Sequence, residues 1–204
     1  MEVIEYLNQI RGTVKKHIGK LKSKEEKYTN KKLAKPFEDI SNKINIAIPL
    51  TTQVLKTQFT SSETTNLISI RKQILKTIYR DFLFIATMSS IEYHFAKILL
   101  QFPKYNTAKE IRKNGVRKVA LKELVDWSYD ERLLSNFDLW DFARCARNDI
   151  VHQNAIARHT KPSPITDFPI DMNQGQGLSG NLRSLLSLTK AVEDSFFQMV
   201  LKLK

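Results

Sequence analysis

The sequence predicts an all-α fold, an up-and-down helical bundle. Apolar residues recur at intervals of three and four over several long segments, which is the spacing of an amphipathic helix. Prolines, which interrupt helices, stand mainly between these segments. The chain has 204 residues, 42% hydrophobic and 26% charged, as in a soluble globular protein with a sizeable core. We expect a bundle over residues 62–204 and a helical extension at residues 1–60.

The expected extension contains two helical segments. Apolar residues follow helical spacing over residues 3–28, although Gly12 and Gly19 lower the helix propensity there. This segment is expected as one amphipathic helix that packs on the domain or on a partner subunit. A second helix begins at Pro36, a residue suited to the first turn, and Pro49 should end it.

The longest helical signal runs from Ser62 to Phe102 and stops before Pro103. Ser61 or Ser62 can cap its amino end. A helix of about forty residues would span roughly 60 Å, at about 1.5 Å per residue. Because that length exceeds a small domain, the helix should bend, break or project into an oligomer.

Residues 107–127 are expected as a basic amphipathic helix, or as two short helices broken at the turn sequence Asn114-Gly115. Residues 128–130 should form a connection. The positive face of this segment could follow a phosphate backbone. Its candidate RNA-binding residues are Lys109, Arg112, Lys113, Arg117 and Lys118.

The last part of the chain should hold two helices and a long loop. The first helix should run from about Ser135 to Arg158, with Ser135 or Asn136 as its cap. Residues 161–180 contain half of the prolines and half of the glycines of the chain, which predicts a loop. Loops of this length either serve a function, here as a flap over a site, or lack fixed structure. Residues 181–204 should form the helix that closes the bundle.

The net charge of +12 favours a polyanionic partner, and nucleic acid is the usual one. A lysine-rich, solvated surface is the alternative interpretation. The basic residues are spread along the chain, with twelve Lys or Arg against six acids in residues 1–60. The absence of long apolar runs predicts no membrane span, and the acidic amino terminus does not resemble a signal peptide. With a single cysteine, the sequence favours a cytoplasmic protein.

Residues 144–152 interrupt the apolar stripe of the helix expected around them with polar side chains. On a helical wheel with about 100° per residue, Arg147 lies at the middle of the buried face. An arginine in that position is seldom left without a partner. Asn148 and His152 are four residues apart, so they lie one above the other beside the stripe. Cys145 is expected as an inert packed thiol, and Asp149 as a solvated acid.

The pattern Arg147-Asn148, three residues and then His152 resembles the signature of the HEPN superfamily. HEPN domains are small helical bundles, and many of them are metal-independent ribonucleases. The match holds at every specified position of this six-residue motif, and it covers the rest of the bundle only loosely. A second pair with similar spacing, Arg11 and His17, lies in a lysine-rich segment interrupted by glycine, so we discount it.

The resemblance implies that Arg147, Asn148 and His152 are catalytic residues. A histidine titrates in the range needed for a general base or acid, and the arginine fork matches phosphate oxygens. Arg147 and His152 lie about 140° apart on one helix, so a single copy presents them awkwardly. Two antiparallel copies would bring both pairs into one cleft. The resemblance also implies a homodimer with a composite site and a 2′,3′-cyclic phosphate product.

Glu92 is a possible supporting residue. The segment Ser89–Phe95 resembles the first core helix of HEPN domains, in which a small polar residue precedes an acid. Glu92 would then be the buried partner of Arg147, and a surface acid is the equal alternative. His94 is about 200° further around the helix and cannot face the same site.

The leading hypothesis is therefore a cytoplasmic, homodimeric, metal-independent endoribonuclease of the toxin or defence type, acting on RNA. An antitoxin or regulatory protein would be a further partner. The alternative is a non-catalytic HEPN-like module that binds RNA or a protein. The sequence has no glycine-rich phosphate loop, no cysteine pair and no His-x-x-x-His motif, so neither a cofactor nor a metal site is expected.

Overall fold

The computed structural model describes residues 2–28, 31–57, 64–102, 121–153, 155–178 and 181–204. These residues form an all-α helical bundle, as the sequence predicts. The elements in chain order are α1 (Glu2–Glu25), α2 (Lys35–Lys56), α3 (Thr64–Thr77), the π-helical segment η1 (Ile78–Phe84), α4 (Ile85–Leu99), α6 (Leu121–Asp130), α7 (Phe137–His152) and α8 (Leu182–Lys202).

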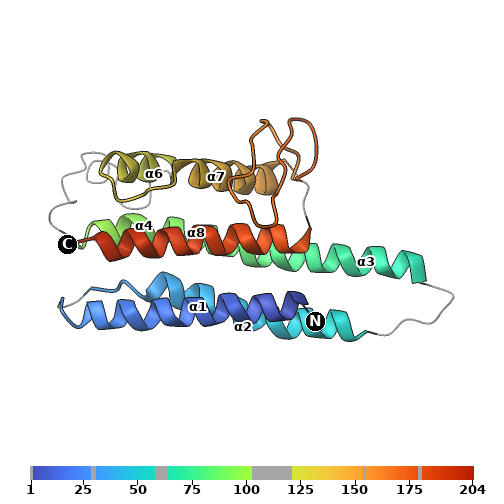
Figure 1. Cartoon of the computed structure of the whole chain (residues 1–204), viewed down its shortest axis with the longest axis horizontal. Coiled ribbons are helices and arrows are strands. Elements are labelled where there is room, and N and C mark those ends of the chain that lie inside the picture. Colours follow the sequence, from blue (N-terminus) through green and yellow to red (C-terminus); the bar gives the residue numbers. More distant parts are fainter. Residues whose placement is uncertain (1, 29–30, 58–63, 103–120, 154, 179–180) are drawn as a thin grey trace.

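The helices lie in three layers (Figure 1). Helices α1 and α2 form one outer layer, and α6 and α7 form the other. The middle layer consists of α8 and the continuous run of α3, η1 and α4. Helix α8 contacts α1 on one side and α7 on the other, so it joins the two outer layers.

An aromatic cluster around Phe196 of α8 fills the centre of the core. Its ring centroid lies 5.6 Å from that of Phe37 on α2, 5.2 Å from that of Phe95 on α4 and 6.4 Å from that of Trp140 on α7. All four side chains are fully buried. Aromatic pairs in such offset and edge-on arrangements add stabilisation beyond the burial of their surface. One side chain therefore ties together helices from all three layers.

Helices α1 and α2, which fall in the expected extension at residues 1–60, contribute to this same core. Leu7, Ile10 and Val14 of α1 are buried, as are Phe37 and Ile44 of α2. Helix α2 packs against α4 and η1, and α1 packs against α8. The apolar face of residues 3–28 thus packs on the bundle itself. Helices on both sides of the expected boundary at residue 60 share one core.

The prediction that Pro49 ends its helix is wrong, because α2 continues to Lys56. A proline inside a helix removes the hydrogen bond to the carbonyl four residues before it, here that of Asn45. Both Pro49 and Asn45 are exposed, so water can solvate the carbonyl that the proline leaves free. The interruption is therefore tolerated on the solvent side of the helix.

The long helical signal starting near Ser62 is realised as α3, η1 and α4 without a break in helical structure. The π-helical turns of η1 lie where this run enters the core, and Tyr79 there donates a hydrogen bond of 3.1 Å to Thr51. Helix α3 extends beyond the end of α8 (Figure 1). Its Ile68, Ile70 and Ile74 are between 43% and 48% exposed.

The expected connection at residues 128–130 belongs instead to α6, which ends at Asp130. The carbonyl of the buried Ser128 accepts hydrogen bonds from the backbone N–H groups of Leu133 and Leu134, so the turn follows the helix. Residues 155–178 contain two isolated antiparallel bridges, Ile156 with Gly177 and Lys161 with Met172. We call residues 155–178 the flap.

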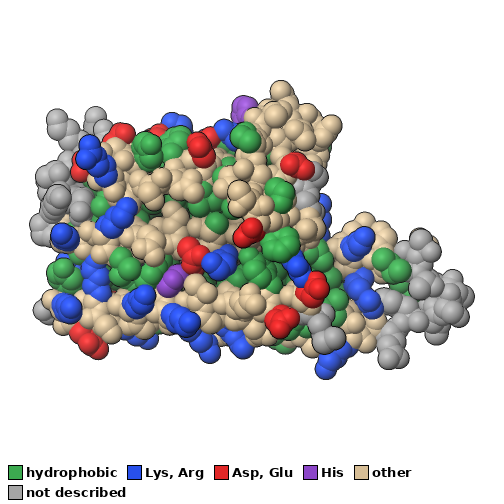
Figure 2. Space-filling model, in the orientation of Figure 1, with side chains coloured by type: hydrophobic (Ala, Val, Ile, Leu, Met, Phe, Trp, Pro, Cys, Tyr) green, Lys and Arg blue, Asp and Glu red, His purple; other side chains and the backbone are tan. Residues whose placement is uncertain are grey.

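Charged side chains cover the outside of the bundle. Lys and Arg gather along the edge formed by α1 and α2 on the face shown in Figure 2. Acidic side chains are interspersed over the same face, so it is not a uniformly positive surface. Among the helices that the structure describes, none has the combined length and apolar character that crossing a bilayer requires.

Replacing Phe196 with alanine should lower the free energy of unfolding by about 3–5 kcal/mol, because it empties the centre of the core. Urea unfolding followed by circular dichroism measures this loss. The control Ile74→Ala removes an apolar side chain that is 43% exposed and should change the stability by less than about 0.5 kcal/mol. Equal effects of the two substitutions would contradict the described core.

Candidate functional site

Helix α7, which carries the motif, is held at its amino end and along its buried face. The side chain of Asn136 accepts a hydrogen bond of 3.2 Å from the backbone N–H of Leu139, so this residue is the cap that the sequence suggests. The indole N–H of Trp140 donates to Ser195 of α8 at 2.9 Å. Ala143 and Ala146 are fully buried and allow close packing beneath the motif. These contacts fix the position of α7, and with it the backbone that carries the polar residues of the motif.

Arg147 has two partners, and Glu92 is one of them. Its Nη2 lies 3.2 Å from a carboxylate oxygen of Glu92 on α4, and its Nη1 donates to the amide oxygen of Asn148 at 3.0 Å. The side chains of Arg147 and Glu92 are 26% and 34% exposed, so the pair is partly shielded from water. The Nε of Arg147 is buried, without a hydrogen bond to any described residue. Two of the five guanidinium N–H donors are thus used by described residues, and the remaining N–H groups on Nη1 and Nη2 are the ones that can reach a ligand.

A cavity of about 260 Å³ opens beside this pair. Arg147, Asn148 and Glu92 line it together with Arg144 from α7 and two residues of α6, Leu121 and Lys122. Three cationic side chains and one carboxylate line the space, and two of the cations are also paired with acids, Arg144 with Asp141 and Lys122 with Asp126. The cationic groups can attract a negatively charged ligand. We call this space the arginine cavity.

Arg144 and Lys122 are cavity residues that the sequence-based site omits. Arg144 lies three positions before Arg147, and this spacing places two helical residues on neighbouring parts of one face. That spacing is the signal that could have found it. Lys122 lies on a different helix, so its place at the cavity depends on the packing of α6 against α7.

His152, the last residue of α7, is exposed and does not line the arginine cavity. Within the described ranges, no side chain forms a hydrogen bond with its imidazole ring. Two apolar neighbours, Val151 and Ile156, are 47% and 49% exposed. One chain therefore places the arginine and the histidine of the motif in different environments.

Asp149 is buried, so the expectation of a solvated acid is wrong. Its side chain is 1% exposed, and it accepts hydrogen bonds from the Nε of Arg158 at 2.8 Å and from the backbone N–H of the same residue at 3.3 Å. The carbonyl of Asp149 also accepts from the N–H groups of Gln153 and Ala155. Ala155 has a φ of 65°, which is incompatible with continuing the helix.

These contacts end α7 at His152 and not near Arg158, where the sequence pattern suggests that it ends. Arg158 lies beyond the turn and binds back to Asp149, so the ion pair closes the chain reversal. A buried carboxylate that meets both a guanidinium and a backbone donor is well compensated. Asp149 therefore fixes the point at which the motif histidine leaves the helix.

The flap is attached to α7 by a second acid, Asp141. Its carboxylate accepts from Lys161 of the flap and, at 2.6 Å, from Arg144. Burial by itself would raise the pKa of Asp141, but the hydrogen bonds from Lys161 and Arg144 outweigh it and hold that pKa below its ordinary value. Because Arg144 also lines the arginine cavity, the flap is connected to the cavity through one carboxylate.

The side chains of Cys145 and His94 lie in surroundings that suit packing and not catalysis. Cys145 is buried, and burial raises the pKa of its thiol, which suits a packed and unreactive side chain. His94 accepts or donates a 3.1 Å hydrogen bond with Asp39 on α2. Glu92 instead pairs with Arg147 on α7, so His94 and Glu92 on α4 face different helices, as the sequence predicts.

The basic residues suggested for RNA contact lie outside the described residues. They are Lys109, Arg112, Lys113, Arg117 and Lys118. These five residues are therefore not included in the site described above. The candidate site rests on α4, α6 and α7 alone.

No protein-family model matches the chain, and neither do the curated proteins and solved structures with which it was compared. The resemblance to the HEPN superfamily accordingly rests on the six-residue motif of the sequence.

Replacing Asp149 with asparagine should lower the free energy of unfolding by about 1–3 kcal/mol, because a buried, charge-assisted hydrogen bond is lost. Hydrogen exchange should rise locally at Gln153 and in residues 155–158, because their turn depends on this side chain. Asp138→Asn, on the first turn of the same helix, changes an exposed acid and serves as the control. Unchanged exchange at the turn would contradict the assigned role of Asp149.

The attachment of the flap should depend on pH through Asp141. Because its pKa is lower in the folded protein than in the unfolded chain, it adds stability above the ordinary pKa of 3.8, and this stability is lost as the pH falls through the lower folded value. The difference in Tm between the wild type and Asp141→Asn should be full at pH 6 and should shrink below about pH 4. A difference that grows as the pH falls would contradict this assignment.

Proposed function

We propose that this protein is a metal-independent endoribonuclease whose site is completed by a second copy of the chain. The observation that carries the proposal is the arginine cavity, in which motif residues Arg147 and Asn148 meet Glu92 beside two further cations. The motif resembles that of HEPN ribonucleases, and the net charge of +12 suits an RNA substrate. The toxin or defence role, with a regulatory protein partner and a cytoplasmic location, is part of the same proposal.

In this mechanism the scissile phosphate enters the arginine cavity. The unused donors of Arg147 would bind its oxygens and stabilise the charge that develops on them. Glu92 and Asn148 are positioning residues, because each accepts one hydrogen bond from the guanidinium, at Nη2 and at Nη1. The other N–H groups of these two nitrogens are not used by these bonds. Fixing the guanidinium before the substrate arrives avoids the cost of ordering it during the reaction.

His152 would supply the proton transfers. One imidazole removes the proton of the ribose 2′-hydroxyl, whose oxygen forms a bond to phosphorus while the bond to the 5′-oxygen breaks. The imidazolium formed in this way then gives its proton to that leaving oxygen. The products are a 2′,3′-cyclic phosphate and a free 5′-hydroxyl. The step requires neither a water nucleophile nor a metal ion.

A dimer fits the separation of the two motif residues. His152 is exposed and does not line the cavity of its own chain, so an imidazole from a second copy is better placed to approach the phosphate. The exposed Val151 and Ile156 beside it supply apolar surface for such a contact. Symmetric pairing along α7 would place each histidine near the arginine of its partner.

A non-catalytic module that binds RNA or a protein is the alternative. The exposed position of His152 favours it, since a histidine without a fixed orientation is a poor general base. In that case the arginine cavity would bind a phosphate or carboxylate without cleaving anything. The experiments below separate the two functions.

Purified protein should cleave single-stranded or structured RNA in the presence of EDTA. His152→Ala and Arg147→Ala should each lower the rate by at least about 100-fold, as expected for loss of acid–base catalysis or of charge stabilisation. His159→Ala, which removes an exposed histidine of the flap, is the matched control and should leave the rate unchanged. Cleavage that persists in both motif variants would refute the proposal, and binding without cleavage would favour the non-catalytic module.

Mixing the two inactive variants tests the composite site. If the arginine of one chain works with the histidine of the other, a mixed dimer of Arg147→Ala and His152→Ala keeps one intact site, and random pairing restores about one quarter of the wild-type rate. Light scattering should show a dimer at micromolar concentration. A monomer, or a mixture without activity, would argue against the composite site.

A further inference from the structure

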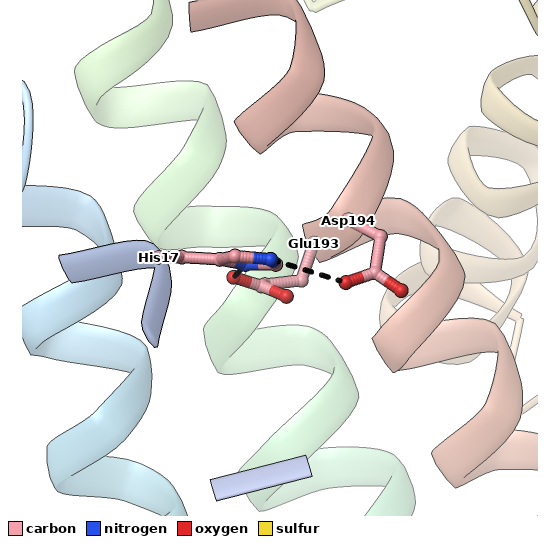
Figure 3. Close-up of side chains that lie close together, drawn as sticks. All are labelled: His17, Glu193 and Asp194. Atoms are coloured by element: carbon pink, nitrogen blue, oxygen red, sulfur yellow. Dashed lines mark hydrogen bonds and ion pairs between the residues drawn. The ribbon is translucent and has the colours of Figure 1, made fainter. Parts of the chain in front are cut away.

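A second group of polar residues lies between α1 and α8, far in sequence from the motif. His17 of α1 and Glu193 and Asp194 of α8 point toward one another (Figure 3). Nitrogen and carboxylate oxygen atoms of the three residues, one from each, lie within 4.8 Å of one another. His17 and Glu193 are 176 positions apart in the chain, so no local sequence motif reveals the group.

The group is only partly satisfied by its own hydrogen bonds. The Nδ1 of His17 lies 2.9 Å from Oε1 of Glu193. The other carboxylate oxygen of Glu193 is buried and has no hydrogen-bond partner among the described residues, although the residue is only 1% exposed. The Nε2 of His17 lies 3.8 Å from Oδ1 of Asp194, which is too long for a hydrogen bond. A buried, unpartnered carboxylate oxygen is costly unless a further positive charge or donor reaches it.

The electrostatics of the group favour a cation. Two carboxylates side by side repel each other unless a proton or a cation lies between them. Lys190 neutralises only the outer oxygen of Asp194, Oδ2, at 2.5 Å, and leaves Oδ1 directed toward the imidazole.

We propose that His17, Glu193 and Asp194 bind one divalent transition-metal ion, and that Zn²⁺ fits the three ligands best. An imidazole nitrogen and two carboxylate oxygens form a usual ligand set for Zn²⁺, with water as the fourth ligand. The ion would compensate the unpartnered oxygen of Glu193 and link α1 to α8. This site is separate from the arginine cavity and has no part in the proposed RNA cleavage.

The surroundings of the three residues suit ligand binding. The imidazole of His17 stacks on Phe197 with ring centroids 3.7 Å apart and an interplanar angle of 9°, so its orientation is fixed. Lys190 holds the second oxygen of Asp194, as outer groups commonly do for ligating carboxylates. Bonds of about 2.0–2.2 Å would draw the ligand atoms to within about 3.5 Å of one another. Asp194, one-third exposed, has room to make most of that movement and gives the ion access from solvent.

The test uses the full chain, treated with EDTA and dialysed, and then titrated with ZnCl₂ by calorimetry. We expect one Zn²⁺ per chain and a rise in Tm of several degrees, because the ion binds the folded state. CoCl₂ should give the visible absorption of a tetrahedral site. Asp194→Asn and Glu193→Gln should each weaken binding by at least about 100-fold, more than the 10- to 100-fold typical of outer groups.

The matched control is His94→Gln, because His94 also pairs with an acid, Asp39, but has no second carboxylate bonded to it among the described residues. This variant should bind Zn²⁺ like the wild type. Circular dichroism checks each fold, and Asp194→Asn carries the test if Glu193→Gln does not fold. No stoichiometric binding of Zn²⁺ or Co²⁺ by the wild type would overturn the proposal and leave a proton to neutralise Glu193. The proposal would also be overturned if Asp194→Asn bound Zn²⁺ like the wild type while His152→Ala or His94→Gln lost Zn²⁺ binding. That result would place the ion elsewhere.

Discussion

The packing of Phe196 against aromatic rings from three other helices is the constraint on which the rest of the structure depends. Its contact with Trp140 sets the distance between α8 and α7, and its contact with Phe95 sets the distance to α4. Phe95 lies three positions after Glu92, so both residues lie on the face of α4 that is turned toward α7. The ion pair between Glu92 and Arg147 therefore depends on the packing around Phe196. The core, in this sense, builds the arginine cavity.

The same helix sets up both polar clusters. On one side, α8 fixes the indole of Trp140 through Ser195 and so holds the motif helix. On the other side, the buried Glu193 meets His17 of α1, whose ring stacks on Phe197. Burying a carboxylate at such a position is costly, and the fold keeps it only because something compensates the charge. The two adjacent residues Glu193 and Asp194 thus couple the outer layer of α1 to the helix at the centre of the bundle.

The helices could be predicted from the sequence because apolar periodicity and capping are local signals. Asn136, one of the two candidates in the sequence, caps α7, and Asn181 caps α8 at the start of its expected range. Pro49 misleads because its effect depends on whether the freed carbonyl faces water, which is a property of the packed helix. The end of α7 was missed for a similar reason: Asp149 is bound by Arg158, a contact that forms only once the chain has turned. Glu92 could be suggested as a partner of Arg147 only from the resemblance of residues 89–95 to a HEPN core helix, and a surface acid was an equal alternative. The group around His17 joins residues too distant in sequence for any spacing rule.

The π-helical segment η1 separates α3 from α4 within one unbroken run of helix. A π-helical turn holds one residue more than the α-helical turn that it replaces. Deleting a single residue between Ile78 and Phe84 would restore regular α-helical bonding with little rotation of α3 relative to α4, because the π-helical turn absorbs the additional residue. The exposed isoleucines of α3 would then keep nearly their present direction, and α4 and its Glu92 would keep their places. The segment is therefore a point at which the length of the chain can change by one residue without turning an apolar surface or rebuilding the core.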